Sequence, residues 1–399
     1  MIGFAFMATV INYLDRQVLS VVVTAPVFKA MVPLTQEAYG YITAAFMLAY
    51  AVSNGLSGLF IDRVGTRVGY ACCMAWWSVA GMLHPFARGP LSLGCFRFLL
   101  GAGEAGNWPA ATKLVTEWFP PKERALASGI FNCGSSIGSV ISPLIIVWVV
   151  AMWGWKSAFL AMGVLGLIWV LAWWFVYFVP ESVAAEVKEP PVGAGKLLRT
   201  RFVIWFTISK VFMDPVWYFF VFWFPKYLSE VHHFSLKEIG WKGWIPYFSA
   251  ALGNLAAGAL TAGLIRSGTP IPTARKVSVS VFALLMLATI PAILTTNAWL
   301  AIALISLTTF GYTGYLANTL AFPADVFPKN TVASIYGLAS MGSGFGGMLF
   351  MGLSGWLIAR YGYTPVFIGY GIMPVVALVI VIFLMGPLRP HPNFSTQKG

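Results

Sequence analysis

The stretch from Arg97 to Arg124, RFLLGAGEAGNWPAATKLVTEWFPPKER, places an arginine and a glutamate inside an otherwise apolar helix. Arg97 and Glu104 are seven residues apart, so at 3.6 residues per turn they share one helix face. The small residues around Glu104 let a neighbouring helix approach closely. Ionisable groups at membrane depth are costly and usually functional, so this face predicts a transport site. The alternative is that Arg97 only pairs with a nearby carboxylate and holds helices together.

A second polar patch lies in the first apolar segment, within INYLDR, residues 11–16. Asn12, Asp15 and Arg16 are related by i+3 and i+4 spacings, and Tyr13 lies three residues before Arg16. An anion can meet Arg16 and Tyr13 at this place, near the middle of the segment. The alternative is that Asp15 and Arg16 neutralise charges on other helices.

The elements that carry these residues are predicted from composition. Of the 399 residues, 59% are hydrophobic and only 10% are charged, and the mean hydropathy is +0.79. This composition excludes a soluble globule and indicates a protein that crosses the lipid bilayer many times. Charged, proline and glycine breaks divide the chain into twelve apolar spans. These are 3–28, 38–61, 68–87, 91–115, 125–150, 157–179, 202–228, 239–265, 276–296, 298–322, 331–358 and 364–386.

The formal net charge of +12 is explained by the loops between the spans. With both termini placed in the cytoplasm, the inner loops carry about twice as many lysines and arginines as the outer loops. This asymmetry follows the positive-inside rule and argues against a nucleic-acid partner.

The loop after the second span reads GLFIDRVGTR, residues 58–67. Asp62 can face the amino end of a neighbouring helix, while Arg63 and Arg67 lie at the cytoplasmic surface. We interpret this loop as a gate. An ordinary basic loop would explain Arg63 and Arg67, but not the complete pattern of glycines and charges.

The chain repeats itself at a shift of 208 residues, which superposes Gly103 on Gly311, Glu117 on Asp325 and Gly138 on Gly346. The repeat predicts two pseudo-symmetric six-helix bundles, residues 1–180 and 202–388. Between them lies a cytoplasmic linker, 181–201, and after them a cytoplasmic tail, 389–399. Glu104 corresponds to Tyr312, so the titratable groups are concentrated in the first half.

The second half offers weaker candidates for binding the substrate. Lys210 and Asp214 lie one helical turn apart, so Lys210 is either a second anion ligand or is neutralised by Asp214. Tyr312 and Asn318 in the tenth span offer neutral hydrogen bonds suited to hydroxyl groups, and ordinary contacts between helices are the alternative.

Several other classes of site are excluded. The cysteines and histidines show no metal-like spacing. The glycine run GLASMGSGFGG lies in an apolar span without a preceding strand or a Lys-Ser/Thr pair, so it is not a nucleotide loop. We therefore expect neither an enzyme nor a bound cofactor or metal.

Five motifs together resemble the major facilitator superfamily. They are INYLDR, the 58–67 loop, GAGEAGNWPAATK with EWFPPKER, the glycine-rich FNCGSSIGSVISP, and ANTLAFPADVFPK. Within that superfamily the chain is similar to the anion:cation symporters, and most similar to bacterial hexuronate transporters. The chain departs from the family pattern at Ala262, where the second half usually repeats the aspartate of the gate loop. That contact is then either weaker or made by other residues.

The resemblance implies roles for five residues. Arg16 would bind the substrate carboxylate with Tyr13 beside it, Asp15 and Glu104 would be the protonatable pair, and Arg97 would respond to their charge. We therefore expect a monomeric, proton-coupled importer of a sugar acid such as a hexuronate. The alternatives are a carrier or exchanger of another carboxylate, aromatic or derived from an amino acid, and a membrane sensor that does not transport.

Overall fold

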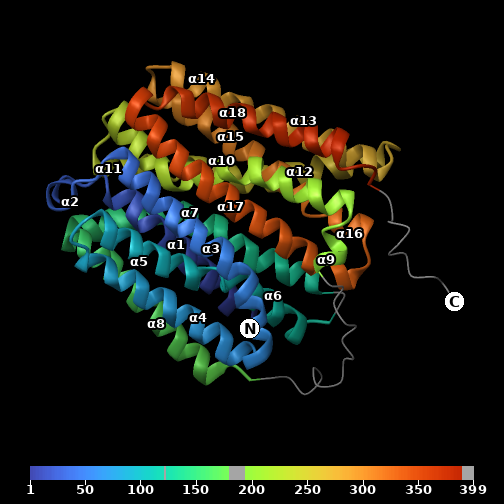
Figure 1. The fold of residues 1–399 in the computed structure, drawn as a ribbon, viewed down its shortest axis with the longest axis horizontal. Coiled ribbons are helices and arrows are strands. Elements are labelled where there is room, and N and C mark those ends of the chain that lie inside the picture. Colours follow the sequence, from blue (N-terminus) through green and yellow to red (C-terminus); the bar gives the residue numbers. More distant parts are fainter. Residues whose placement is uncertain (121–122, 179–193, 389–399) are drawn as a thin grey trace. The chain divides into compact units, whose positions relative to one another are not determined.

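The computed structural model describes residues 1–120, 123–178 and 194–388, and these form helices without a single strand (Figure 1). Residues 181–193 of the predicted linker and the whole predicted tail, 389–399, lie outside the described residues.

Every predicted span corresponds to one helix or to two or three consecutive helical segments. The helices before the linker are α1 (Ile2–Val22), α2 (Pro26–Met31), α3 (Gln36–Val64), α4 (Thr66–Leu83), η1 (His84–Phe86), α5 (Pro90–Glu104), α6 (Asn107–Trp118), α7 (Arg124–Trp153) and α8 (Trp155–Val176). Within the predicted linker lies α9 (Ala194–Leu197). The helices that follow are α10 (Arg201–Val231), α11 (Leu236–Lys242), α12 (Ile245–Arg266), α13 (Ile271–Leu285), η3 (Met286–Ala288), α14 (Thr289–Leu294), α15 (Ala298–Thr319), α16 (Phe322–Val326), α17 (Lys329–Tyr361), α18 (Thr364–Val379) and the π-helical turn η4 (Ile380–Leu384).

Eight helical segments of the described chain are long and apolar enough to cross a membrane. The other four predicted spans are α1, α4, α5 with α6, and α10. Three of these four contain the ionisable residues singled out in the sequence: Asp15 and Arg16 in α1, Arg97 and Glu104 in α5, and Lys210 and Asp214 in α10.

Prolines explain where the predicted spans were too long. The first span was expected to continue to residue 28, but α1 ends at Val22 and α2 begins at Pro26, with Ala25 extended before it. The span 91–115 is divided between Glu104 and Asn107, because Pro109 has no N–H for the carbonyl of Ala105. The hydroxyl of Ser57 donates to that carbonyl instead, at 3.5 Å.

The described chain forms two compact units. Unit 1 contains residues 1–187, 218–245 and 347–362, and unit 2 contains 188–217, 246–346 and 363–399. The predicted bundles were defined by the sequence repeat, whereas these units are defined by which residues lie near one another in space. The two divisions answer different questions, so the predicted bundle boundaries stay a prediction.

Glycines bring the first helix of each repeat close to a partner helix. In unit 1, a Cβ on Gly138 of α7 would lie 2.8 Å from the carbonyl oxygen of Val10 in α1. In unit 2, a Cβ on Gly346 of α17 would lie 2.5 Å from the carbonyl oxygen of Val211 in α10. Gly138 and Gly346 are the residues that the repeat superposes, so the same close packing recurs in both units.

The core of unit 1 positions its ionisable residues. α1 packs against α7, α8 and α6, and α5 packs between α3 and α4. A Cβ on Gly101 of α5 would lie 2.4 Å from the carbonyl oxygen of Phe46 in α3. Only glycine permits this approach, which brings the polar face of α5 close to α3.

Candidate functional site

The centre of the site is an ion pair between α1 and α5. The Nε and Nη2 atoms of Arg16 each lie 2.9 Å from Oε2 of Glu104. The exposed fractions of the two side chains are 2% and 0%, so the pair is shielded from water and exchange with solvent ions does not weaken it. This pair is the contact with a charge on another helix that the alternative for Arg16 expected, and the role of Arg16 as a substrate ligand stays a prediction.

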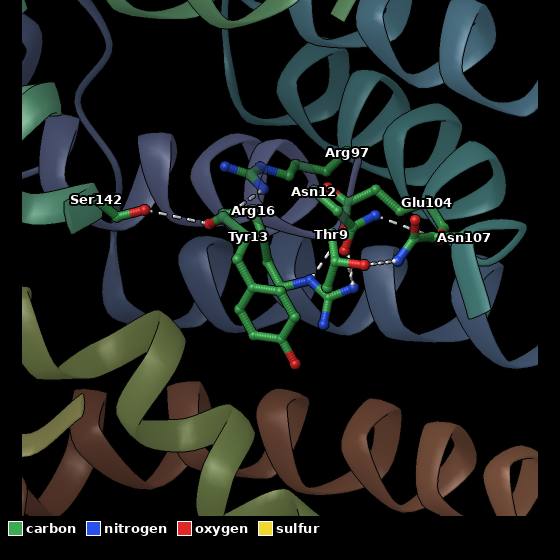
Figure 2. A network of polar contacts seen from close by, with 8 residues as sticks. All are labelled: Thr9, Asn12, Tyr13, Arg16, Arg97, Glu104, Asn107 and Ser142. Carbon is green, nitrogen blue, oxygen red and sulfur yellow. Dashed lines mark hydrogen bonds and ion pairs between the residues drawn. The ribbon is translucent and has the colours of Figure 1, made fainter. Parts of the chain in front are cut away.

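Asn12 ties this pair to the backbone of α5. Its Oδ1 accepts a hydrogen bond from Nη2 of Arg16 at 3.2 Å, and its Nδ2 donates to the carbonyl oxygen of Glu104 at 3.3 Å. Figure 2 shows the side chains of Asn12, Arg16 and Glu104 converging. The carbonyl of Glu104 lies at the end of α5, where the helix is interrupted, and can therefore accept a side-chain donor.

Aromatic rings surround the Arg16 guanidinium. Its Cζ lies 5.0 Å from the ring centroid of Tyr13, 5.4 Å from that of Phe46 and 4.9 Å from that of Tyr50. Each distance is within the range of a cation–π interaction. Tyr13 was predicted beside Arg16, but Phe46 and Tyr50 were missed. Their i,i+4 spacing on one face of the second span was the available signal, and it is common in a chain with 16% aromatic residues.

Arg97 and Asp15 lie close to this pair. Among the described contacts, neither side chain forms an ion pair with the side chain of Arg16 or Glu104. Nη1 of Arg97 donates to the backbone carbonyl of Arg16 at 3.2 Å, and the side chain is 1% exposed. Asp15 is 3% exposed, and its Oδ1 lies against Gly81 of α4.

Several of these buried polar atoms have no protein partner. In the described part of the chain, Nε and Nη2 of Arg97 and Oδ2 of Asp15 make no hydrogen bond. Arg97 also forms no ion pair there, and its bond to the carbonyl of Arg16 joins α5 to α1, so its role stays a prediction. Groups buried without partners are expensive, which is typical of a site that changes its contacts during a reaction cycle.

The candidates of the second half lie in unit 2. Nζ of Lys210 is 3.3 Å from Oδ1 of Asp214, and the hydroxyl of Tyr312 donates to the same oxygen at 3.2 Å. The ring of Trp217 stacks on that of Tyr312, with centroids 5.3 Å apart. Lys210 is thus paired with Asp214, as one of the two sequence interpretations expected.

Asn318 is fully occupied by contacts between helices. Its Oδ1 accepts from the hydroxyl of Thr261 at 2.8 Å, and its Nδ2 donates to Ser278 at 2.9 Å. These bonds join α15 to α12 and α13. They favour the structural interpretation of Asn318 over the binding of substrate hydroxyls.

The predicted gate residues lie at the end of α3 and the start of α4. Asp62 pairs with Lys113 at 3.1 Å, and Nζ of Lys113 also donates to the carbonyl oxygen of Ile61 at 2.7 Å. Arg67 donates to the carbonyl oxygen of Trp174 at 2.6 Å and stacks over its ring. Arg63 is exposed on the last turn of α3.

The second half has alanine at position 262 and makes a different ionic contact. Nε of Arg275 lies 2.5 Å from Oδ2 of Asp325 in unit 2. At the shift of 208 residues, Arg275 corresponds to Arg67 and Asp325 to Glu117. Glu117 accepts hydrogen bonds from Thr66 at 2.8 Å and from Tyr177 at 2.6 Å. Each half therefore fixes its acidic residue to a different neighbour.

The described residues contain no group of three or more histidine, cysteine, aspartate or glutamate side chains placed to hold a metal ion. The charged groups of the Arg16 site are one carboxylate held by a guanidinium, with a second carboxylate and a second guanidinium close by. Such a set can exchange one carboxylate for another and can bind or release protons.

Known transport proteins resemble this chain over most of its length. The sequence matches the family description Major Facilitator Superfamily over residues 5–272 and 273–399. It is 31% identical to the hexuronate transporter of Escherichia coli strain K12, over 96% of this chain and 92% of that protein. It is 27% identical to the D-galactonate transporter of Escherichia coli O6:H1 strain CFT073, over 96% of this chain and 94% of that protein.

Among solved structures, that of a D-xylose-proton symporter is similar with a TM-score of 0.77 at 13% identity. The likeness covers 97% of this chain and 98% of that one. The predicted fold class, an all-α integral membrane protein with twelve membrane helices, is thereby confirmed.

Proposed function

Because this chain belongs to the major facilitator superfamily, we propose that it imports a sugar-acid anion, in the first place a hexuronate, together with protons. The support for the substrate class is that similar proteins are named as hexuronate and galactonate transporters. The proposed mechanism is alternating access, in which the substrate site opens to one side of the membrane at a time.

One observation carries the proposal: the buried ion pair of Arg16 with Glu104. A guanidinium is planar and presents paired donors that match a carboxylate. In this structure Nε and Nη2 of Arg16 hold a carboxylate of the protein, so they have the geometry to hold the carboxylate of a substrate. Glu104 is therefore in the position of an internal competitor for the substrate.

Competition for Arg16 links substrate binding to protonation. While Glu104 is ionised, a substrate carboxylate has to displace it from Arg16 and leave a second negative charge nearby. When Glu104 is protonated, its bond to Arg16 weakens and the extra charge is removed. Binding of the anion and binding of the proton therefore favour each other.

A count of the ionisable residues within the spans also links binding of the anion to binding of a proton. Asp15, Glu104 and Asp214 carry three negative charges, and Arg16, Arg97 and Lys210 carry three positive charges. An isolated charge at the centre of a membrane helix costs roughly 2.5–3.5 kcal/mol, so a balanced set is the one tolerated. A monoanionic substrate unbalances the set by one charge, and one proton restores the balance.

We place the other site residues as follows. Tyr13, Phe46 and Tyr50 hold the Arg16 guanidinium in place. Lys210 and Tyr312 stay candidates for substrate binding that rest on the sequence. Asp62, Arg63 and Arg67 act at the cytoplasmic gate. The protein works as a monomer in the bacterial inner membrane, with both termini in the cytoplasm.

Uptake by proteoliposomes tests the proposal. Purified protein is reconstituted, and uptake of labelled glucuronate, galacturonate and galactonate is measured with and without an inwardly directed proton gradient. Accumulation of a hexuronate only with the gradient is expected. Uptake of an aromatic or amino-acid-derived carboxylate alone would assign a different substrate, and exchange without accumulation would make the protein an exchanger.

A further inference from the structure

A groove opens on the surface of unit 1 between α7 and α11, and we call it the α7–α11 groove. Its volume is about 620 Å³, which is within the range of roughly 300–1,000 Å³ that is typical of sites for small ligands. Neither the sequence analysis nor the proposed function gives this groove a role. The residues that line it are Leu144, Val147, Trp148 and Ala151 of α7 and Leu236, Lys237, Gly240 and Trp241 of α11.

Two close contacts show how the helices on either side of the groove run. A Cβ on Gly240 of α11 would lie 2.9 Å from the Cβ of Val147 in α7, and a Cβ on Gly243, just after α11, would lie 3.5 Å from the Cβ of Pro143. The later residue of α11 thus meets the earlier residue of α7, so the two helices are antiparallel. The wall formed by 144–151 is about 10 Å long at 1.5 Å per residue.

The lining of the groove is apolar except at one position. Seven of its eight residues are aliphatic, aromatic or glycine, and the eighth is Lys237. Trp148 and Trp241 are 57% and 72% exposed. In a chain that crosses the bilayer, such a surface faces lipid, and tryptophan is enriched where the lipid tails meet the headgroups. The groove therefore has the composition of a surface at that boundary.

Lys237 lies at one end of the groove. Because the helices are antiparallel and Gly240 lies against Val147, the start of α11 lies level with Ala151 at the end of the α7 wall. With both termini in the cytoplasm, as proposed above, α11 begins at the outer face of the membrane. Lys237 is then at the level of the outer headgroups, and the apolar walls extend from it into the bilayer.

The charge of Lys237 is not compensated by the protein. Among the described residues, Lys237 forms neither a hydrogen bond nor an ion pair. The adjacent Glu238 is bound elsewhere, because its carboxylate pairs with Lys242 at 3.2 Å and accepts hydrogen bonds from the backbone and hydroxyl of Ser235 at 3.0 and 2.9 Å. A free cation at the head of an apolar groove is complementary to a molecule with an anionic head and an apolar tail.

The size of the groove favours a lipid over a second copy of this chain. A stable protein interface uses roughly 20–30 residues on each side, whereas eight residues line this groove. A slot between two helices that is about 10 Å long instead suits part of one acyl chain.

We propose that the α7–α11 groove binds one anionic phospholipid of the outer leaflet, with phosphatidylglycerol as the type. Its phosphate lies at Lys237, and part of one acyl chain lies between α7 and α11. Basic residues at the membrane surface attract anionic headgroups, and basic pockets between membrane helices hold them. The inference does not depend on which substrate the protein carries.

Photolabelling in nanodiscs of a zwitterionic lipid tests whether the site selects an anionic head. One probe is phosphatidylglycerol with a diazirine on an acyl chain, and the matched probe has a phosphatidylethanolamine head. Mass spectrometry then measures labelling of the peptides that contain residues 144–151 and 236–241. The phosphatidylglycerol probe is expected to label both peptides more strongly than the matched probe. Equal labelling by the two probes would overturn the proposal, since the groove would then be ordinary lipid-facing surface.

Variants of Lys237 test the proposed contact with the phosphate. Lys237→Gln should lower labelling by the phosphatidylglycerol probe about fivefold, the effect of removing one basic residue near an anionic lipid, and Lys237→Arg should label normally. Lys156→Gln is the matched control, because exposed Lys156 lies over the ring of Trp155 and does not line the groove. Unchanged labelling of Lys237→Gln, or an equal decrease in Lys156→Gln, would refute the contact.

A second variant leaves the charge in place and fills the groove. Ala151→Trp should remove most of the labelling of the 236–241 peptide by the phosphatidylglycerol probe. Met152→Trp should not, because Met152 is 62% exposed and does not line the groove. Unfolding temperatures close to that of the unchanged protein show that the variants are folded. Normal labelling of a folded Ala151→Trp protein would show that no acyl chain lies in the groove.

Discussion

Arg16 and Glu104 lie 88 residues apart in the sequence and form an ion pair of 2.9 Å between α1 and α5. Both side chains are almost completely buried, so neither can be left charged and alone without a large cost. A substrate that binds to Arg16 must therefore be accompanied by a change in the charge or the partner of Glu104. The predictions below follow from that requirement.

Arg16→Lys should weaken binding of a hexuronate by roughly 10- to 100-fold, because a hydrogen bond to a charged group contributes about 1.5–3 kcal/mol and the ammonium loses the paired geometry. Binding is measured by calorimetry on purified protein. Arg88→Lys, in an exposed loop, is the matched control and should bind normally. If Arg16→Lys bound the substrate as tightly as the unchanged protein, the paired-donor role of Arg16 would be wrong.

Tyr50→Leu should weaken binding roughly 30-fold, since a desolvated cation–π contact to Arg16 contributes about 2 kcal/mol. Tyr50→Phe keeps the ring and should bind nearly normally. Parallel binding curves for the two variants check this. Equal weakening in both would show that the hydroxyl of Tyr50, and not its ring, is what the site uses.

Asn318→Ala should lower stability by about 1–3 kcal/mol, because Thr261 and Ser278 are left without their partner inside the bundle. Substrates with and without hydroxyl groups should be affected equally. Denaturation in detergent gives the stability, and exposed Asn132→Ala is the control. A loss confined to hydroxylated substrates, with unchanged stability, would return Asn318 to the binding site.

The sequence was sufficient to single out the ionisable residues of the first half that the structure buries, and their functional roles stay predictions. Arg16, Asp15, Arg97 and Glu104 are ionisable groups inside apolar spans, and such groups are recognisable without a structure. Their pairing was not predictable. The seven-residue spacing placed Arg97 and Glu104 on one face of a helix. In the structure, Glu104 instead pairs with Arg16 of another helix. Such a pairing depends on how closely the helices approach one another, which glycine contacts such as that of Gly138 with α1 help to set.

Two other kinds of feature, helix breaks at prolines and close contacts between glycines, could not be predicted from the sequence. The breaks at Pro26 and Pro109 lie inside continuous apolar runs, so hydropathy alone extends the spans across them. The close contact between Gly40 of α3 and Gly355 of α17 joins positions more than three hundred residues apart, and glycine is common throughout the chain. Nothing in the sequence distinguished these two glycines from the others.

Accumulation of substrate by Glu104→Gln protein in proteoliposomes is the most direct test of the central claim that Glu104 links proton binding to anion binding. Glutamine resembles the protonated glutamate, so the variant should still bind a hexuronate and exchange it across the membrane, but it should not accumulate it when a pH difference is imposed. Glu238→Gln, on the exposed face of α11, should accumulate normally. Full pH-driven accumulation by Glu104→Gln would contradict the account and make Asp15 the leading candidate for the coupling residue.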